Sequence, residues 1–250
     1  MIGISGVVIS RNEEASIARC LESLSFCDEI IVVDSGSHDR TVEIAKSITP
    51  KVFHRDWSGY AAQKNFACEK ASGKWIISVD ADEVVDNDLR EELLRRLPKS
   101  EREVAFWVPR KTFHSGRWIR FGGWYPNRLV RVFRRDAGKW VGEDVHERWE
   151  PNGETADLNG HLLHYSFGGI ADQVERNNHY STLGAKDLLR RGEKFSLPKL
   201  VLKPVVKFFE TFFLKRGFLD GLPGFMISVS AGYSVFLKWA KLWELQRDAR

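Results

Sequence analysis

The stretch KWIISVDADE, residues 74–83, joins an apolar run to three closely spaced carboxylates. The run is short and rich in β-branched residues, which predicts a buried strand. Asp80, Asp82 and Glu83 follow at its carboxyl end, where open α/β sheets bind their ligands. A cation stabilises such a cluster, and Mg²⁺ or Mn²⁺ on carboxylate oxygen often shares its other positions with substrate phosphates. The stretch therefore indicates either a metal–diphosphate site or, more simply, an acidic turn before a helix.

The sequence before this stretch alternates between short apolar runs and segments with helical spacing. Alternation at this pitch predicts an α/β fold with a doubly wound, mostly parallel sheet. Asn12 is expected to cap the first helix, because its side chain can accept a hydrogen bond from a free N–H group of the first turn. The expected strands are 4–9, 29–33, 52–54 and 74–79, and the expected helices follow Asn12 and cover about 41–47 and 59–71.

The alternation ends after Asp82, which indicates a change of architecture along the chain. A helix is expected at 87–97, strands at 104–109 and 129–134, irregular structure over 140–169, and helices from Asp172 onward. We therefore divide the chain into residues 1–100, residues 101–170 and a C-terminal helical extension, residues 171–250. The uncharged run Leu222–Leu237 is shorter than the roughly twenty residues that span a bilayer.

Composition narrows the functional class only slightly. The 250 residues carry a formal net charge of +4, which is too small to argue for a nucleic-acid partner. Cys20, Cys27 and Cys68 form no CxxC pair, so we expect a reducing compartment and no disulfide framework. The first apolar run, Ile2–Ile9, is too short for a signal peptide and leads directly into charged residues. We therefore expect a cytoplasmic protein.

Several motifs occur in the order found in one large enzyme family. In chain order they are SRNE (10–13), IVVDSGSHD (31–39), QKN (63–65), ASG (71–73) and SVDADE (78–83). This set resembles the nucleotide-sugar half of family-2 glycosyltransferases, which have a GT-A fold. The later motifs are GGWYP (122–126), VHE (145–147), HLLHY (161–165), KP (203–204) and GFLDG (217–221). They resemble the bacterial lipopolysaccharide-core β-glucosyltransferase branch of that family.

The resemblance implies a UDP-sugar donor that binds together with a divalent metal, Mg²⁺ or Mn²⁺. It places the metal on Asp80 and Asp82, with His164 as a further ligand and His161 as the alternative. It also implies that residues 1–100 form the nucleotide-sugar-binding half of the GT-A domain and residues 101–170 the acceptor and catalytic half. The donor-binding residues that it implies are Asn12, Glu13, Asp34, Lys64, Asp80, Ala81 and Asp82.

Two of these donor-binding residues have alternatives. Lys64 resembles a basic residue near the diphosphate or the base, but it could also be a solvated helix lysine. The family's second strand commonly ends in Asp-Asp, whereas this chain has Asp34-Ser35, so the second carboxylate for the uracil contact is absent. An Asx turn is the simpler role for Asp34.

An inverting transfer needs a base that takes the proton of the acceptor hydroxyl while the anomeric carbon is attacked from the opposite face. The resemblance favours Glu147, in the VHE motif, as this base and leaves Asp144 as the second candidate. His146 would orient the base or the acceptor. An ion pair with a nearby arginine is the simpler role for each of these carboxylates.

Two basic and aromatic regions suggest what the acceptor is. The loop 111–131 combines arginines, which bind phosphate in bidentate fashion, with aromatic rings, which stack on sugars. The segment 199–216 combines four phenylalanines with lysines, which is typical of binding to a membrane surface. Packing against another part of the chain or a second subunit is the simpler explanation for that segment.

On this basis the sequence predicts an inverting, metal-dependent hexosyltransferase. It would move a hexose, glucose from UDP-glucose, to an anionic lipopolysaccharide-core or other lipid-linked saccharide. We expect a peripheral protein at the inner face of the cytoplasmic membrane, with no nucleic-acid partner and an oligomeric state that stays open. The alternatives are the same fold acting on a polyprenyl phosphate, a capsular glycan or a peptide, and a non-catalytic nucleotide-sugar or glycan-binding module.

Overall fold

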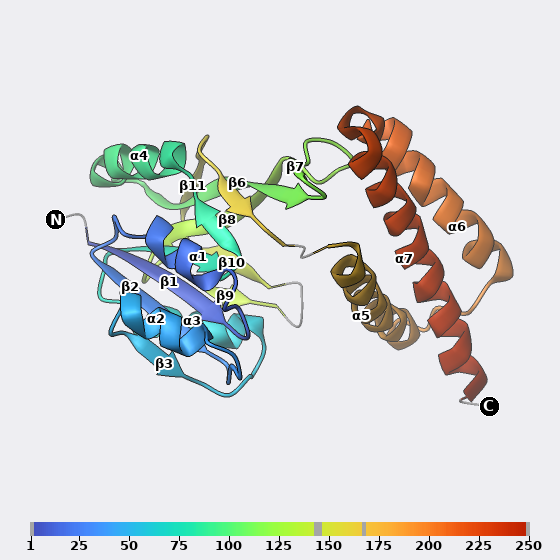
Figure 1. Ribbon diagram of the computed structural model, residues 1–250, viewed down its shortest axis with the longest axis horizontal. Coiled ribbons are helices and arrows are strands. Elements are labelled where there is room, and N and C mark those ends of the chain that lie inside the picture. The colour runs from blue at the N-terminus through green and yellow to red at the C-terminus, as the bar shows by residue number, and fades with distance from the viewer. Residues whose placement is uncertain (1–2, 143–146, 167–168, 249–250) are drawn as a thin grey trace. The chain divides into compact units, whose positions relative to one another are not determined.

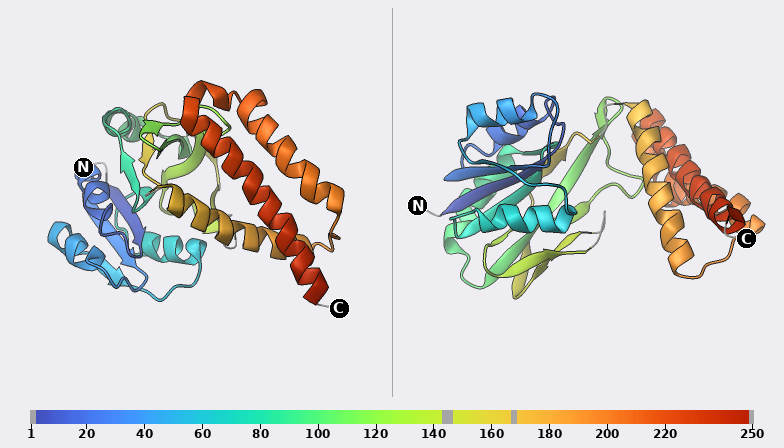
Figure 2. Two further views of the ribbon diagram at one scale, coloured as in Figure 1. Left: turned by 45° about the vertical axis from the view of Figure 1, so that its right-hand side comes forward. Right: turned by 90° about the horizontal axis from the view of Figure 1, so that it is seen from below.

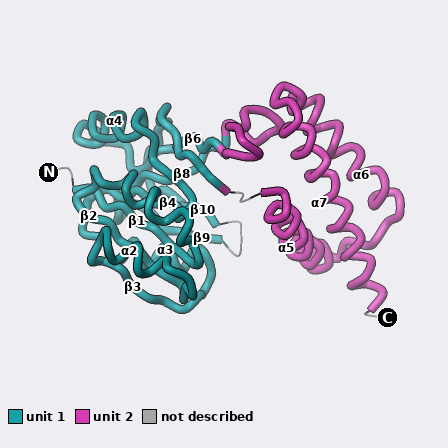
Figure 3. Tube along the Cα trace, in the orientation of Figure 1, with its two compact units in different colours: residues 1–111, 127–165 teal, residues 112–126, 166–250 magenta. Residues whose placement is uncertain are grey.

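The protein consists of two compact units (Figure 3). The computed structural model describes residues 3–142, 147–166 and 169–248. Unit 1 comprises residues 1–111 and 127–165, and unit 2 comprises residues 112–126 and 166–250. The long strand β6 (Glu103–His114) begins in unit 1 and ends in unit 2.

Unit 1 is built on a sheet whose first four strands are parallel (Figure 1). These strands are β1 (Ile4–Ser10), β2 (Glu29–Asp34), β3 (Val52–His54) and β4 (Trp75–Asp80). They lie in the order β3-β2-β1-β4, and β1 is buried over its whole length. Continuous apolar runs are expected for strands that are covered on both faces. The structure thus confirms the predicted α/β fold with a mostly parallel sheet.

The sheet continues beyond β4 with antiparallel strands. The additional strands of the main order are β8 (Asn127–Arg134), β6, β12 (Leu162–His164) and β5 (Glu83–Val85), while β11 (Glu154–Asp157) pairs with β6 in the parallel direction. β8 pairs with β4 on one side and with β6 on the other. β12 returns antiparallel to β5 and places His164 opposite Glu83. A segment far along the sequence is therefore brought to the end of β4.

Helices cover both faces of this sheet, as the right view of Figure 2 shows for the blue helices and cyan α3. The helices of unit 1 are α1 (Ile17–Ser23), α2 (Thr41–Ile48), α3 (Tyr60–Glu69) and α4 (Asn87–Arg96), with a 3-10 turn at Leu97–Lys99. Successive strand residues point to opposite faces. Val8 accordingly joins the core with α1, α2 and α4, while Val7 joins the core with α3.

The cap predicted at Asn12 is wrong, because α1 begins only at Ile17. Asn12 instead adopts a left-handed backbone conformation, with φ 54°. Its Oδ1 accepts a hydrogen bond from the backbone N–H of His38 at 2.9 Å, and its own N–H donates to Ser37 Oγ at 2.8 Å. Asn12 therefore joins two loops instead of starting a helix.

The prediction of irregular structure over 140–169 is also wrong. This region contributes to four short strands, namely β9 (Gly138–Val141), β10 (Arg148–Pro151), β11 and β12. Runs of three or four residues are too short to show the period of two that identifies a strand. The antiparallel β9–β10 pair sets Trp140 opposite Trp149, and Trp149 stacks on Phe133 with ring centroids 4.3 Å apart.

Unit 2 is mainly helical, which confirms the predicted C-terminal helical extension. It contains the end of β6, β7 (Arg117–Trp118), α5 (Ile170–Arg190), α6 (Leu197–Phe209), a π turn (Glu210–Leu214), a 3-10 turn (Gly217–Asp220) and α7 (Gly221–Asp248). Its small core contains Ala185, Trp239 and Leu242. Among the described residues, no helix is both long enough and apolar enough to cross a membrane.

A buried carboxylate and a close backbone contact fix the start of α7. Asp220 is fully buried and accepts hydrogen bonds from the backbone N–H groups of Arg120, at 3.1 Å, and Phe121, at 2.8 Å. Four residues later, Gly224 packs directly on the carbonyl of Gly217. A Cβ at position 224 would lie 1.9 Å from that oxygen.

We predict that Gly224→Ala destabilises the protein although alanine is the better helix former. Helix propensity alone favours alanine by about 1 kcal/mol, but the new methyl group would displace the backbone of Gly217. Gly184→Ala, in α5, is the matched control because its Cβ would meet only the flexible end of Lys238. Urea denaturation should give a lower midpoint for Gly224→Ala and an unchanged or higher one for Gly184→Ala. Equal midpoints for both variants would contradict the packing argument.

Candidate active site

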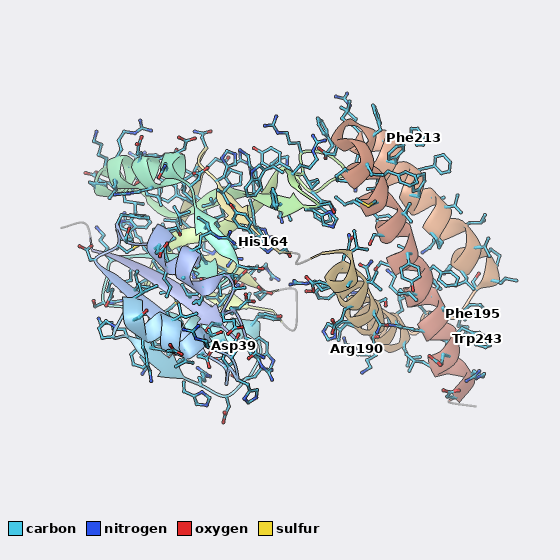
Figure 4. All side chains as sticks on the ribbon, viewed as in Figure 1. Asp39, His164, Arg190, Phe195, Phe213 and Trp243 are labelled. Carbon is cyan, nitrogen blue, oxygen red and sulfur yellow. The ribbon has the colours of Figure 1, made fainter. Side chains whose placement is uncertain are left out.

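The predicted donor-binding residues follow one edge of the parallel sheet. Ser10 at the end of β1 pairs with Asp34 at the end of β2, and Ile9 pairs with Asp80 at the end of β4. The carboxyl ends of the three strands therefore lie side by side, where open α/β sheets bind ligands. Figure 4 labels Asp39, from the loop after β2, and His164, from β12.

The loops after β1 and β2 are joined by hydrogen bonds. Besides the contacts of Asn12, the backbone N–H of Glu13 donates to Thr41 Oγ1 at 2.7 Å. The buried Asp34 accepts from the backbone N–H groups of Gly36 and Ser37 at 2.9 and 2.8 Å. These bonds give Asp34 the Asx-turn geometry that was the simpler alternative for it. Its contact with a nucleobase stays a prediction.

Asp80 lies between two cations at the end of β4. Its Oδ2 is 2.6 Å from Arg131 Nη2, on β8, and its Oδ1 is 3.0 Å from Lys64 Nζ, on α3. Burial alone would raise the pKa of Asp80, but the charges of Arg131 and Lys64 outweigh it and hold the pKa well below its ordinary value. Asp80 is therefore a carboxylate with both oxygens in ion pairs.

Lys64 is buried, so the alternative of a solvated lysine is wrong. Its side chain is 1% exposed, and its Nζ lies 3.0 Å from Asp80 Oδ1 and 3.0 Å from Glu147 Oε1. The same ammonium lies 4.6 Å from the centroid of the Trp140 ring, within the range of a cation–π interaction. Lys64 thus joins the end of β4 to the residue predicted as the catalytic base.

The neighbours of Lys64 in the QKN motif fix the position of α3. Gln63 Nε2 donates to the carbonyls of Arg55 and Asp56 at 2.9 and 3.0 Å. Asn65 holds the backbone of Trp140 at two points, because its Nδ2 donates to the carbonyl and its Oδ1 accepts from the N–H, both at 2.9 Å. The three residues of the motif therefore have three separate structural roles.

Arg131, Glu83 and Arg110 complete the surroundings of Asp80, and the sequence did not reveal this. Fully buried Glu83 lies 3.2 Å from Arg131 Nη2 and 3.0 Å from Arg110 Nη1. Burial alone would lower the pKa of Arg131, but Asp80 and Glu83 raise it above its ordinary value. The only signal available in the sequence was an arginine within an apolar strand, which is rare unless the charge is paired.

Asp82 and His164 come together on the other side of this turn. The turn that contains the buried Ala81 directs Asp82 toward β12. There the backbone carbonyl of Asp82 accepts a hydrogen bond from the backbone N–H of Tyr165 at 2.9 Å. His164 Nε2 lies 3.2 Å from Asp82 Oδ2. The alternative ligand His161 is instead 3.2 Å from Asp86, the residue that caps α4.

Asp82 and His164 are too few ligands to hold a metal ion by themselves, but the Asp82 carboxylate suits a cation that binds together with the substrate. Within the described residues, no group of three histidine, cysteine or acidic side chains is arranged to hold a metal ion by itself. Mg²⁺ usually keeps several waters and is held by one or two carboxylates together with substrate phosphates. The Asp82 carboxylate fits that pattern, whereas the imidazole of His164 is not an oxygen ligand and Asp80 would have to exchange an ion pair for the metal.

The candidate bases are only partly described by the structure. Asp144 and His146, with Glu143, lie outside the described residues. Glu147 precedes β10, and its side chain is 17% exposed. In the described structure its ion pair is with Lys64, while it interacts with Arg131 only through the charge at longer range. Among the predicted bases, Glu147 is the one for which the structure describes a connection to Asp80, through the ion pairs of both residues with Lys64.

Three arginines of the predicted phosphate-binding loop make contacts within the protein. Arg131 is buried against Asp80, Arg128 lies 2.7 Å from Asp157, and Arg117 donates to the carbonyl of Asp220 at 2.9 Å. Arg131 is 4% exposed, whereas Arg128 and Arg117 are 39% and 46% exposed, and ion pairs at the surface contribute little to stability. The guanidinium of Arg131 is therefore a poor candidate for binding an acceptor phosphate, whereas those of Arg128 and Arg117 stay candidates.

Comparison with known proteins places this architecture in a family. The sequence profile described as Glycosyl transferase family 2 matches residues 5–152. The chain is 33% identical to the lipopolysaccharide core biosynthesis glycosyltransferase LpsC of Rhizobium meliloti (strain 1021), over 96% of this chain and 92% of that protein. It is also 33% identical to an uncharacterized glycosyltransferase of Rickettsia typhi, over 99% of this chain and 89% of that protein.

Solved structures agree at the level of the fold. Glucosyl-3-phosphoglycerate synthase of Mycobacterium tuberculosis in complex with phosphoglyceric acid aligns with a TM-score of 0.52 and 19% identity, over 78% of this chain and 81% of that chain. The same enzyme in complex with Mg²⁺ and UDP aligns with a TM-score of 0.51 and 18% identity. This similarity confirms the GT-A-like fold. The profile match and the similarity to LpsC show that the chain belongs to glycosyl transferase family 2.

Proposed function

We propose that this glycosyltransferase is an inverting, metal-dependent enzyme that moves glucose from UDP-glucose to a lipopolysaccharide-core or other lipid-linked saccharide. The observation that supports this most directly is the ion-pair connection from Asp80 through Lys64 to Glu147. It brings a partly exposed carboxylate next to the acidic turn that follows β4. The similarity to LpsC supports the choice of acceptor.

The donor would bind along the carboxyl edge of the parallel strands. Asn12, Glu13 and Asp34 would contact the nucleoside from the loops after β1 and β2, and Ala81 would face the diphosphate. Asp82 and His164 would hold Mg²⁺ or Mn²⁺, with Asp80 as the third predicted ligand. The bound cation would neutralise the negative charge that develops on the departing UDP.

Glu147 would act as the general base. As the acceptor oxygen forms its bond to the anomeric carbon, the bond from that carbon to the UDP oxygen breaks on the opposite face. The proton of the acceptor hydroxyl passes to the Glu147 carboxylate. His146 would orient the base or the acceptor, and Asp144 is the second candidate for the base.

The helices of unit 2 would bind the membrane that carries the acceptor. α6 has no buried residue, and large apolar side chains are exposed along it and along the π turn that follows. The most exposed are Leu197, Val201, Leu202, Val205, Val206, Phe209, Phe213 and Leu214, of which Figure 4 labels Phe213. Lysines share the same helix, so apolar area and positive charge could meet an anionic lipid surface together. This supports peripheral binding to a membrane surface, which we propose to be the inner face of the cytoplasmic membrane.

We predict that Asp82→Ala abolishes turnover while the protein still melts normally, because it removes a proposed ligand and no core packing. Asp157→Ala, which removes an exposed carboxylate on β11, is the control and should keep turnover. UDP release should require Mn²⁺ or Mg²⁺ and stop in EDTA. In the wild type, Mn²⁺ should increase the thermal shift caused by UDP-glucose, because a ligand that binds only the folded state stabilises it. Full activity in EDTA, or in Asp82→Ala, would contradict the metal site.

We predict that Glu147→Gln lowers turnover by about 10²-fold or more, in line with the loss of a general base. The substitution keeps the shape of the side chain, so UDP-glucose binding, measured by calorimetry, should be unchanged. Glu150→Gln, on neighbouring β10, is the control because that carboxylate pairs only with exposed Arg148 in the described structure. Wild-type turnover in Glu147→Gln together with an inactive Asp144→Asn would move the role to Asp144.

We predict that the wild type co-sediments with liposomes containing phosphatidylglycerol and that binding weakens as salt rises, because charges are screened within about 10 Å at 0.1 M ionic strength. Leu202→Glu with Val206→Glu should release the protein, since both side chains are more than half exposed and their loss removes little packing. Ile48→Glu with Leu94→Glu, two exposed apolar residues of unit 1, should still bind. A wild type that ignores these liposomes at low salt would assign the α6 surface to a protein contact.

A further inference from the structure

Six charged side chains form one continuous series of ion pairs inside unit 1, and their signs alternate. In order they are Arg110, Glu83, Arg131, Asp80, Lys64 and Glu147. The successive nitrogen–oxygen distances are 3.0, 3.2, 2.6, 3.0 and 3.0 Å. Three cations and three carboxylates make the series neutral, as burial of charged groups requires.

The series connects six separate parts of the chain. Its members come from β6, β5, β8, β4, α3 and the residue before β10. Three interior members are the most deeply buried, since the side chains of Glu83, Lys64 and Arg131 are 0%, 1% and 4% exposed. Glu147, which ends the series, is 17% exposed. Asp80 and Arg110 are also partly exposed, at 28% and 19%, so the series is buried at Glu83, Lys64 and Arg131 and reaches solvent at its other three members.

Lys64 has little freedom to move away from Glu147. Asp80 holds its ammonium from one side, and Asp80 is itself held by Arg131. The residues on either side, Gln63 and Asn65, anchor α3 to the rest of unit 1 through the backbone contacts described above. A lysine normally has several rotatable bonds and a large choice of positions. Here its nitrogen is fixed, and so is the oxygen Oε1 of Glu147 that it contacts.

We propose that Lys64 is a positioning residue for Glu147, and that it acts on turnover through that carboxylate and not through affinity for the donor. The inference rests on the proposed function, in which Glu147 is the base. It differs from the role suggested by the family resemblance, which places this lysine near the diphosphate. The fixed ammonium would hold one oxygen of Glu147 and so direct the carboxylate toward the acceptor hydroxyl.

A double-mutant cycle tests this role with Lys64→Met, Glu147→Gln and the double variant. Lys64→Met should lower kcat by about 10²-fold, the effect expected when a catalytic group is misplaced by about 1 Å. Its KM and calorimetric Kd for UDP-glucose should stay at the wild-type values. If Lys64 acts only through Glu147, the double variant has the kcat of Glu147→Gln, so the two effects are not additive. Lys70→Met, at the end of the same helix, is the control and should keep wild-type kinetics.

The double variant keeps the test decisive even if Lys64→Met does not fold. It removes one cation and one carboxylate together, so the series stays neutral, and it can be compared directly with Glu147→Gln. A double variant with lower kcat than Glu147→Gln, or with weakened UDP-glucose binding, would overturn the inference and return Lys64 to the donor. Wild-type turnover in Glu147→Gln would overturn the base assignment and the inference together, so the two failures are distinguishable.

Discussion

The ion pairs of Asp80 with Arg131 and Lys64 constrain the whole candidate site. The two cationic partners of Asp80 are buried and need a counter-charge, because an unpaired buried charge is strongly unfavourable. The partners come from β8 and α3, so the end of β4 can be formed only when both elements are in place. Arg131 also pairs with Glu83, and Lys64 also pairs with Glu147, so the same constraint applies to β5 and to the start of β10. The position of each charged group thus depends on the folding of the entire unit.

This arrangement separates the tasks of neighbouring acidic residues. Asp80 is engaged on both oxygens by cations, whereas Asp82, two positions later, contacts the imidazole of His164. The loops that would receive the nucleoside are already joined, as the bonds of Asn12 and Glu13 show. A site whose polar groups are oriented before the substrate arrives does not have to reorganise during the reaction. The ion pairs and the loop contacts both orient polar groups before the substrate binds.

Unit 2 is stabilised in a different way. Its helices pack through small residues and a compact core, as Gly224 against Gly217 and the contacts of Trp239 show. It leaves the apolar residues of α6 exposed, an arrangement that a surface meeting only water would not favour. The chain therefore combines one unit fixed by buried charges with another whose outer surface is suited to an apolar partner.

The sequence by itself determined the α/β class, the positions of the first four strands along the chain and the acidic turn at Asp80 and Asp82, because these depend on local periodicity and on the residues at the end of each strand. It also indicated the family, through the resemblance of its motifs to those of family-2 glycosyltransferases. Only the tertiary structure decided that Lys64 is buried, that His164 and not His161 meets Asp82, and that Arg131 holds Asp80. Lys64 and Glu147 lie 83 positions apart, and no local pattern records such a pair. Charged residues look alike in a sequence, and their roles are set by which opposite charge the fold places beside them.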